Sequence, residues 1–367
     1  MNSLLCSAAV LVLLPSMALA EVVQTETGPM SISSVAQGLE EPWGLAFLPD
    51  EAFLVTERGG RLWVARGDAM RTVAGVPPVF EDGQGGLLDV LVPADFATSR
   101  EVWLTFATAM GDGASTAVGF GLLSTDGARL ESFRTVFTGD AYPGGRHFGA
   151  RLVELPDGTI ALTTGDRGTG PDGMQAQDRL SSLGKVILLN RDGSPAIEQE
   201  GWLPGAFSRG HRNIQGAALD LSGRLLTVEH GAQGGDELNA PEPGKNYGWP
   251  VITYGIDYND DPIGEGQAKD GMEQPLHYWD PSIAPSGLMV YSGKLVPDWT
   301  GDIFFGSLNT DFLGRLDPDA PTATGFAEER ISAPETGRVR DVIEAPDGSI
   351  WFLSVHDGAV YRMAPAE

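Results

Sequence analysis

The chain has 367 residues, of which 42% are hydrophobic, so it has enough apolar material for a large core and is not a disordered chain. Its formal net charge is −26, which argues against binding to nucleic acid or to an anionic membrane surface. An anionic ligand would need a locally positive pocket in so acidic a protein, which makes clustered arginines informative.

Residues 1–20 are predicted to be a secretory signal peptide. Residues 4–14 form an apolar stretch too short for a membrane span, and Ala18-Leu19-Ala20 is an A-x-A cleavage site. The single cysteine, Cys6, lies in this segment, so the mature chain is expected to have no disulfide and no cysteine ligand. We therefore expect a periplasmic or secreted protein, cleaved near Ala20, with residues 21–367 forming one domain.

One pattern recurs along the mature chain: an apolar strand, a short turn with Pro, Asp or Gly, and a second apolar strand. Six such hairpins are predicted, at residues 43–57, 87–107, 150–164, 216–229, 287–306 and 340–353. No stretch shows a sustained helical period. The repeats predict an all-β fold, a six-bladed β-propeller of four-stranded antiparallel blades. A pair of β-sandwiches or a barrel is the alternative, but the recurrence of the turn at the same place in each unit favours the propeller.

A histidine and an aspartate flank the third hairpin. His147 precedes its first strand in Gly144-Gly145-Arg146-His147, and Asp166 follows its second strand. In a hairpin the two lie at the same open end, where a carboxylate fixes the tautomer of an imidazole and raises its basicity, as a general base requires. The alternative is a loop histidine that hydrogen-bonds a backbone carbonyl.

Two arginines, Arg338 and Arg340, stand two residues apart at the start of the sixth hairpin. On a strand this spacing places both on one face, which suits a carboxylate or phosphate ligand. Ion pairs with nearby acidic residues are the alternative. The sequence has no P-loop and no G-x-G-x-x-G that opens a helix, so a nucleotide cofactor is unsupported.

A glycine-rich loop at residues 231–235 leads into Asp236 and Glu237. Glycine allows backbone carbonyls to approach a ligand closely, and carboxylate and carbonyl oxygens together suit Ca²⁺. A solvated acidic turn is the alternative. The residues from 254 to 281 form a long insertion that is expected to rim the site.

Short motifs occur in a specific order along nearly the whole mature chain. They include PWGLAFLPD at 42–50, GQGGLL at 83–88, GHRN at 210–213, NYGWP at 246–250, PSIAPSG at 281–287 and RVRDV at 338–342. In their order and spacing they resemble the soluble PQQ-dependent aldose sugar dehydrogenases, the glucose/sorbosone dehydrogenase family. The resemblance implies a six-bladed propeller, in agreement with the repeat count, and an enzyme that oxidises aldose sugars.

The resemblance also implies roles for particular residues. His147 is expected to take the proton of the sugar C1 hydroxyl while the C1 hydride passes to pyrroloquinoline quinone (PQQ), which gives a lactone. Asp166 is expected to orient His147, and Arg212 to polarise the quinone oxygens. The residues expected to bind the cofactor are Gln84, Arg212, Asn213, Tyr258, Ser307, Leu308, Asn309, Arg338, Val339 and Arg340.

Two calcium ions are implied in the same way. One is expected between PQQ and the backbone carbonyls of Gly231 and Ala232, and a second, structural one at Glu237 and the carbonyl of Tyr247. The further partners implied are an aldose sugar and an external electron acceptor. The insertion that shapes dimers in some members is short here, so a monomer is expected.

The chain departs from the glucose-oxidising members at Asn309, where a lysine aimed at the cofactor would stand. The change removes one positive charge, although the amide can still donate a hydrogen bond. Two other functions stay open on the sequence. One is a calcium-dependent lactonase or esterase, which needs carboxylates and amides around a central metal; the other is a non-enzymatic propeller that binds a carbohydrate.

Overall fold

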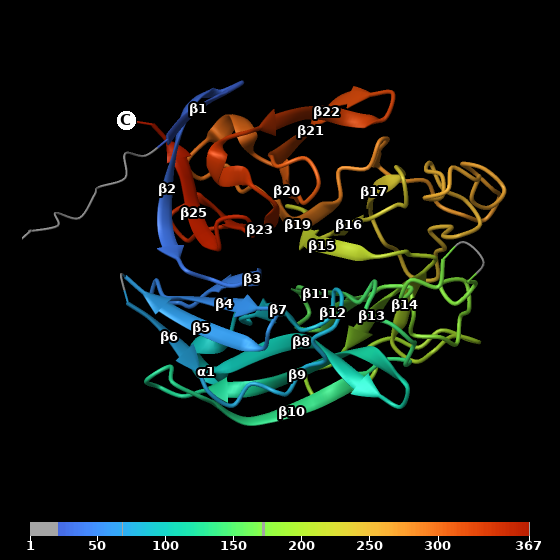
Figure 1. Cartoon of the computed structure of the whole chain (residues 1–367), viewed down its shortest axis with the longest axis horizontal. Coiled ribbons are helices and arrows are strands. Elements are labelled where there is room, and N and C mark those ends of the chain that lie inside the picture. Colours follow the sequence, from blue (N-terminus) through green and yellow to red (C-terminus); the bar gives the residue numbers. More distant parts are fainter. Residues whose placement is uncertain (1–20, 68, 171–172, 367) are drawn as a thin grey trace, which may run out of the picture.

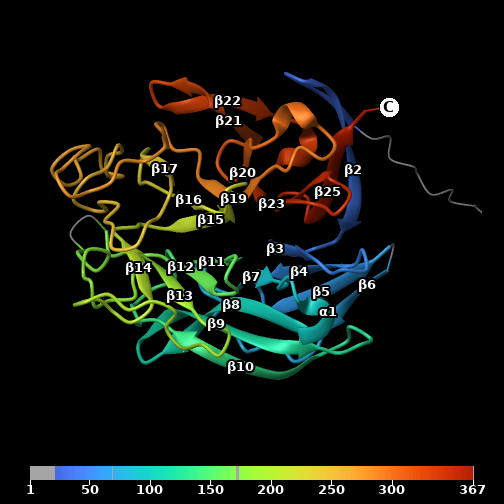
Figure 2. The ribbon, with the colours of Figure 1, turned by 180° about the vertical axis from the view of Figure 1, so that it is seen from behind.

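The structure is a computed structural model that describes residues 21–366 except 68, 171 and 172, so the expected signal peptide, residues 1–20, lies outside the described part. Six antiparallel β-sheets surround a common centre (Figures 1 and 2). Helix in the described residues is limited to α1 (Phe96–Ser99), η1 (Pro297–Trp299) and η2 (Pro334–Thr336). None of these helices is long and apolar enough to cross a membrane.

The sheets are called blades 1 to 6, and in each the strands are given from the centre outward. Blade 1 is β3 (Pro42–Phe47), β4 (Phe53–Glu57), β5 (Arg61–Arg66) and β6 (Ala69–Val73); blade 2 is β7 (Leu87–Leu91), β8 (Glu101–Met110), β9 (Gly113–Leu123) and β10 (Leu130–Thr138). Blade 3 is β11 (Gly149–Glu154), β12 (Ile160–Thr164), β13 (Lys185–Leu189) and β14 (Ala206–Arg209); blade 4 is β15 (Ile214–Leu219), β16 (Leu225–Glu229), β17 (Asp236–Asn239) and β18 (His277–Trp279). Blade 5 is β19 (Pro285–Val290), β20 (Ile303–Ser307), β21 (Leu313–Thr322) and β22 (Gly325–Ile331); blade 6 is β23 (Val339–Glu344), β24 (Ile350–Ser354), β25 (Ala359–Pro365), β2 (Gly28–Gln37) and β1 (Glu21–Thr25).

The structure confirms the predicted six-bladed propeller, and the six predicted hairpins are the two innermost strands of the six blades. Their turns form because an aspartate side chain bonds the backbone two residues ahead. Asp157 Oδ1 accepts from Thr159 N at 3.0 Å in blade 3, and Asp347 Oδ1 accepts from Ser349 N at 2.9 Å in blade 6. The repeated turn therefore fixes the same hairpin in different blades.

Strands β1 and β2 are absent from the predicted elements. β2 pairs antiparallel with β25, so a strand near the N-terminal end of the described chain and its last strand close the ring within one blade, where the blue and red ribbons meet in Figure 1. β1 then adds a fifth strand to blade 6, one more than expected. The sequence signal for β2 is weak because only Met30 and Ile32 along it are buried.

The innermost strands touch one another in the order β3, β7, β11, β15, β19, β23 and back to β3. One residue in each inner strand comes immediately before an apolar residue that pairs with the second strand of its blade. In chain order these equivalent residues are Gly44, Asp89, Arg151, Gly216, Gly287 and Asp341. The axis is therefore surrounded by three glycines and three charged residues.

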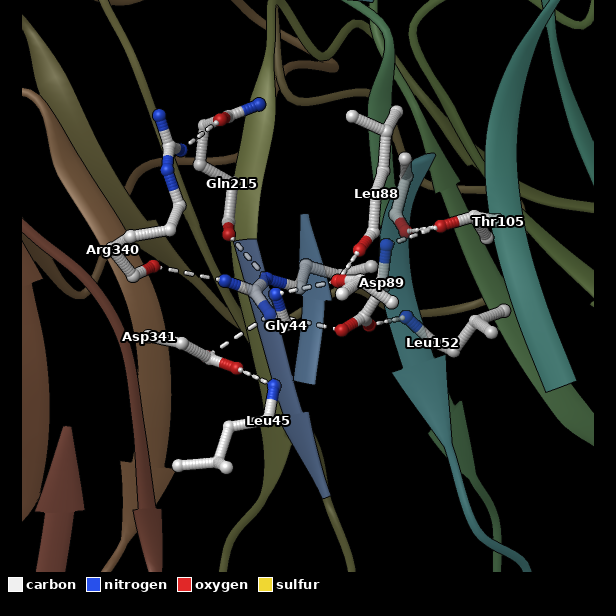
Figure 3. A network of polar contacts seen from close by, with 12 residues as sticks. Gly44, Leu45, Leu88, Asp89, Thr105, Leu152, Gln215, Arg340 and Asp341 are labelled. Atoms are coloured by element: carbon white, nitrogen blue, oxygen red, sulfur yellow. Dashed lines mark hydrogen bonds and ion pairs between the residues drawn. The ribbon is translucent and has the colours of Figure 1, made fainter. Parts of the chain in front are cut away.

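Asp89 and Asp341, which Figure 3 labels, form with Arg151 what we call the axial cluster. Arg151 Nη1 lies 3.0 Å from both Asp89 Oδ1 and Asp341 Oδ1, while Arg151 also donates to the carbonyls of Gln215 and Arg340. The carboxylates accept from the backbone of Leu152 and Leu45 in turn. These contacts join the innermost strands of blades 1, 2, 3, 4 and 6.

Blade 5 makes room for the axial cluster. A Cβ on Gly287 would lie 2.3 Å from Asp341 Oδ1, so any larger residue would displace that carboxylate. An apolar cluster then fastens blade 5 to blade 6, with Trp299, Phe304 and Phe352 completely buried beside Ile32 of β2. The closing strand thus contributes to the core as well as to the sheet.

Candidate active site

Two adjoining cavities lie where the innermost strands begin. The larger, about 650 Å³, is lined by Trp43, Gln215 and Arg340 among others, and the smaller, about 580 Å³, by His147, Arg212 and Trp249 among others. Gln84, Ala232 and Tyr258 line both cavities. The two spaces therefore share a wall and can hold a large planar ligand beside a smaller one.

A third cavity, about 310 Å³, is lined by later residues of the same strands, such as Phe47, Val92 and Glu344. The axial cluster stands between it and the larger cavity. Its three side chains line the third cavity, whereas Gln215 and Arg340, whose carbonyls Arg151 holds, line the larger one. The axial cluster therefore forms the floor under the larger cavity.

His147 and Asp166 are in direct contact, with His147 Nδ1 2.6 Å from Asp166 Oδ1. They lie at one end of the β11–β12 hairpin, where Gly149 pairs with Thr164. Because an ionised carboxylate only accepts hydrogen bonds, Nδ1 carries the proton and Nε2 keeps its lone pair. The pair therefore has the arrangement of an oriented base.

The backbone of His147 is held in a left-handed conformation, with φ of 48°. This conformation is unfavourable for a residue with a Cβ, and here it is secured on both sides. His147 N donates to Gln84 Oε1 at 2.7 Å, and Arg167 N donates to His147 O at 3.2 Å. Gln84 thus fixes the loop that carries His147, in addition to lining the cavities.

The charge states of the pair follow from its surroundings. Burial lowers the pKa of His147 below its ordinary value, although Asp166 opposes this effect, and the positive charges of Arg212 and Arg146 lower it further. Burial works against ionisation of Asp166, but the hydrogen bond from His147 and the charge of Arg212 hold its pKa below the usual value. A neutral imidazole therefore faces an ionised carboxylate at neutral pH.

Asp166 is completely buried and has two further partners. Its Oδ1 accepts from Gly168 N at 2.7 Å, and its Oδ2 accepts from the indole Nε1–H of Trp249 at 2.8 Å. Trp249 belongs to the segment from 240 to 276 that connects β17 to β18. The face of the same indole lies 5.2 Å from the guanidinium carbon of Arg212.

Arg212 precedes β15 and points into the smaller cavity. Its Nη1 donates to the carbonyl of His230 at 3.1 Å and its Nη2 to the hydroxyl of Tyr258 at 3.3 Å, while its backbone N donates to Glu229 Oε2 at 2.6 Å. Asn213 Oδ1, next in the chain, accepts from Gln215 Nε2 at 3.0 Å. Arg212, Asn213 and Tyr258 are therefore gathered on one side of the site.

Arg338 and Arg340 both line the larger cavity, as their spacing predicts. Arg338 Nη1 donates to the carbonyl of Leu308 at 2.9 Å, and Arg340 Nη1 donates to Gln215 Oε1 at 2.9 Å. Neither has a carboxylate partner within ion-pair distance among the described residues. Burial and the neighbouring Arg151 and Arg338 lower the pKa of Arg340 to about 9. This side of the cavity is thus suited to an anion.

The remaining expected cofactor residues divide into two groups. Leu308 and Asn309 line the larger cavity, and Asn309 Nδ2 lies 3.3 Å from the carbonyl of Ser282. Ser307 and Val339 are completely buried and absent from that lining: Ser307 Oγ donates to Ile283 O at 2.8 Å, and Val339 packs in the core. These two side chains support the wall and do not face the cavity.

The glycine-rich loop lies at the wall of the larger cavity, where Gly231 and Ala232 are among the lining residues. A Cβ on Gly231 would lie 2.1 Å from the carbonyl of Gly234, so the loop can close only with glycine there. Asp236 does not point to solvent, as an acidic turn would require. It accepts from the backbone N–H groups of Gly231, Ile283 and Ala284 at 2.7–2.9 Å and so ties the loop to blade 5.

Glu237 is at a different place, inside blade 4. Burial and the charge of Glu229 raise its pKa to about 8. Asn239 Nδ2 donates to both carboxylates, at 3.0 and 3.1 Å, while Asn239 Oδ1 is buried without a partner in the described part of the chain. Tyr247 is buried nearby, stacked on His211 with ring centroids 4.8 Å apart. No group of three or more His, Cys, Asp or Glu side chains suited to a metal occurs in the described residues.

Three features of the site were not predicted. Trp249 belongs to the NYGWP motif, but nothing in the local pattern shows how the connection between β17 and β18 folds. Gln215 and Trp43 line the larger cavity from β15 and β3. The axial cluster did have a signal, because Asp89, Arg151 and Asp341 are charges inside otherwise apolar inner strands.

Comparison with known proteins places the chain in a family. Residues 39–362 match the sequence profile of Glucose / Sorbosone dehydrogenase. The chain is 37% identical to aldose sugar dehydrogenase YliI of Escherichia coli (strain K12), over 96% of this chain and 98% of the relative. A crystal structure of glucose dehydrogenase is 42% identical, with 92% of this chain and 99% of that chain covered and a TM-score of 0.85. The PQQ-bound aldose sugar dehydrogenase of Streptomyces coelicolor is 29% identical, with coverage of 91% and 98% and a TM-score of 0.75. This protein belongs to the glucose/sorbosone dehydrogenase family.

Proposed function

We propose that this protein oxidises the C1 hydroxyl of an aldose sugar to the lactone in a PQQ-dependent reaction, after export to the periplasm or beyond. The observation that supports this most strongly is the juxtaposition of an oriented base, His147, with an adjoining cavity lined by Arg338 and Arg340. A proton acceptor and an anion site then share one wall. Residues 21–367 are proposed to form a single dehydrogenase domain.

The residues present fit PQQ, which is a flat polyanion. The Nε atoms of Arg212 and Arg340 are buried and have no hydrogen-bond partner among the described residues. Burial and the charges of Arg151 and Arg338 lower the pKa of Arg340, although Asp341 opposes the shift. A bound anion would offset these charges and use the free donors. When bound, PQQ supplies the acceptor for the C1 hydride of the sugar.

The chain's own groups are then assigned as follows. His147 Nε2 takes the proton of the C1 hydroxyl, and the anionic Asp166 stabilises the imidazolium that forms. Arg212 polarises the quinone oxygens, while Arg338 and Arg340 bind the carboxylates of the cofactor. Gln84, Asn213, Tyr258 and the wall built by Ser307, Leu308, Asn309 and Val339 complete the binding site.

Calcium is proposed at two places. Gly231 and Ala232 line the larger cavity, and their backbone carbonyls would hold one ion next to the cofactor. A second ion would be bound by Glu237 and the Tyr247 carbonyl; the high pKa of Glu237 and the unpartnered Asn239 Oδ1 fit a cation at that place. Its role would be structural, because this group lies inside blade 4.

The reaction is tested by reconstitution. The purified protein is incubated with PQQ and Ca²⁺, and reduction of a redox dye is followed with a panel of aldoses. We expect dye reduction with one or more sugars, dependent on PQQ. An absence of both cofactor binding and dye reduction would contradict the proposal. Lactone hydrolysis without PQQ would favour a lactonase instead.

The base is tested by His147→Ala. This variant should bind PQQ as the unaltered protein does but lose turnover by a factor of at least about 10²–10⁴, the usual contribution of a positioned base. His356→Ala, at an exposed position, is the control and should keep full turnover. Normal turnover of His147→Ala would show that another group takes the proton.

A further inference from the structure

We propose that Trp249 is a positioning residue for this reaction: its indole N–H fixes the Asp166 carboxylate and, through it, the tautomer and ring orientation of His147. The inference rests on the proposed role of His147 as the base. It concerns a residue that touches neither of the two atoms between which the proton would move.

The first observation is the distribution of hydrogen bonds on Asp166. Oδ1 is shared by His147 and Gly168, at 2.6 and 2.7 Å, whereas Oδ2 accepts from Trp249 Nε1 at 2.8 Å. Within the described residues this indole is the recorded partner of Oδ2. Without it, a fully buried carboxylate oxygen would be unpaired, and the carboxylate would be free to turn about the bond that aims Oδ1 at His147.

The second observation is that Trp249 is itself held firmly. Its backbone N donates to Gly210 O at 2.9 Å, and its carbonyl accepts from Gln177 Nε2 at 2.7 Å. Its indole packs with Ala176, Ala232 and Ile263 and is 5% exposed. A donor anchored in this way can transmit orientation to Asp166, as a partner of a site residue must.

The third observation is that the other charged groups near His147 have a different effect. Arg146 precedes it in the chain, Arg212 and His230 approach from blade 4, and Arg167 follows Asp166. They change the electrostatic potential at the imidazole. Among the described side chains, Trp249 is the one that hydrogen-bonds Asp166 from outside the His147 pair.

The indole also contacts two of the groups to which roles are assigned, Asp166 and Arg212. Its edge carries the N–H toward Asp166, and its face lies against the guanidinium of Arg212. One rigid ring thus sets the positions of the base and of the arginine proposed to contact the quinone. Trp249 comes from the connection between β17 and β18 in blade 4, whereas His147 and Asp166 belong to blade 3.

The test is Trp249→Phe, which keeps an aromatic ring against Arg212 and removes the N–H. We expect kcat to fall about 10- to 100-fold, the usual effect of losing the partner that orients a site residue, with KM for the sugar and the affinity for PQQ changed less than about twofold. Trp63→Phe is the matched control, because the indole N–H of Trp63 on β5 is buried without a partner in the described structure. That variant should keep the kcat of the unaltered protein.

A second readout needs neither cofactor nor sugar. The chain has five histidines, so ¹⁵N NMR of the imidazoles can follow His147 in the protein alone. We expect one Nδ1–H tautomer with a strongly downfield proton in the unaltered protein and in Trp63→Phe, and a mixture of tautomers in Trp249→Phe. Unchanged kcat together with an unchanged His147 signal in Trp249→Phe would overturn the proposal.

A third measurement applies even if Trp249→Phe does not fold. The Trp249 Nε1–H proton of the unaltered protein should exchange slowly with solvent, since it is buried in a hydrogen bond to a carboxylate. Exchange as fast as that of an exposed indole would overturn the proposal. If instead no sugar is oxidised while the NMR results are as expected, the proposed reaction fails and the positioning of His147 by Trp249 stands.

Discussion

At the scale of single residues, the acid–base behaviour of His147 depends mainly on its burial. The side chain is 11% exposed, and desolvation disfavours the imidazolium more than the Asp166 carboxylate favours it. The two arginines nearby act in the same direction as burial. A base with a lowered pKa is available at neutral pH without prior loss of a proton.

The titration of His147 should reflect this. Since the pKa of His147 in the protein without cofactor lies below the ordinary 6.5, its imidazole should stay neutral through neutral pH and take up a proton only below pH 6.5. The titration is followed by ¹⁵N NMR of the protein without PQQ, and samples returned to pH 7 check for irreversible loss. A midpoint above pH 6.5 for His147 would contradict this assignment.

The sequence was sufficient to predict the contact between His147 and Asp166, because a hairpin brings its two ends together. It was also sufficient to assign Arg338 and Arg340 to one cavity, although Arg338 precedes β23 and has a φ of 48°, so the alternation of a strand is not what brings the two together. It was not sufficient for Trp249, whose position depends on how residues 240–276 fold back over blade 3. Ser307 and Val339 are a different case. They lie in motifs that resemble the cofactor-binding motifs of the family, but their side chains point away from the cavity because of the pleat of their strands.

At the scale of elements, the six inner strands are held together by charge as well as by packing. Arg151 lies between two buried carboxylates, and burial raises the pKa of Asp89 to about 6 although Arg151 opposes the shift. Burying three charged side chains costs free energy. Removing one of them from the folded protein costs more, because its partners are left as uncompensated buried charges.

Arg151→Leu should therefore destabilise the protein by about 3–5 kcal/mol, as measured by urea unfolding. Arg66→Leu removes the exposed ion pair of Arg66 with Asp50 and should cost at most about 1 kcal/mol. Equal losses in the two variants would mean that the axial cluster adds little to the closure of the ring.

A second prediction at this scale concerns calcium and blade 4. The folded pKa of Glu237, about 8, lies above its unfolded value of 4.5, so the calcium-free protein binds more protons than the unfolded chain between these values. The stability of the calcium-free protein should thus fall as the pH rises from about 4.5 to about 8. Calcium replaces the proton, so it should raise the thermal midpoint more at pH 8 than at pH 6.

The free energy of unfolding at pH 8 should rise by about 2.7 kcal/mol when the calcium concentration is 100 times its Kd. Glu237→Gln should lose this stabilisation, while Glu242→Gln, at an exposed position of the same connection, should keep it. Calorimetry of the three proteins with and without calcium measures this stabilisation. If calcium stabilised Glu237→Gln as much as the unaltered protein, the ion would have to be bound elsewhere.

At the scale of the whole molecule, the ring is closed by β2, which the sequence pattern does not reveal. The hairpins were predictable because each turn and each apolar run is local. β2 pairs instead with β25, at the opposite end of the chain, and most of its residues are polar and partly exposed. Its contribution is concentrated in Met30 and Ile32, which pack between blades 5 and 6.

Ile32→Ala should therefore lower stability by about 2–5 kcal/mol, more than a change in a terminal strand would ordinarily suggest. Val22→Ala on β1 is the control, because Val22 is 51% exposed and should change stability by less than about 0.5 kcal/mol. Thermal unfolding of both variants checks this. A negligible effect of Ile32→Ala would mean that the ring stays closed without the packing of β2.

The axial cluster also affects how ligands reach the cavity above it. The cavity above it and the cavity below it share no lining residue among those described, so the axial cluster separates the two. A sugar, its lactone and an electron acceptor that must reach the reduced cofactor would then all enter and leave the upper cavity on the side away from the axial cluster. We therefore expect the two substrates to take turns, with parallel lines in double-reciprocal plots when sugar and acceptor are varied together.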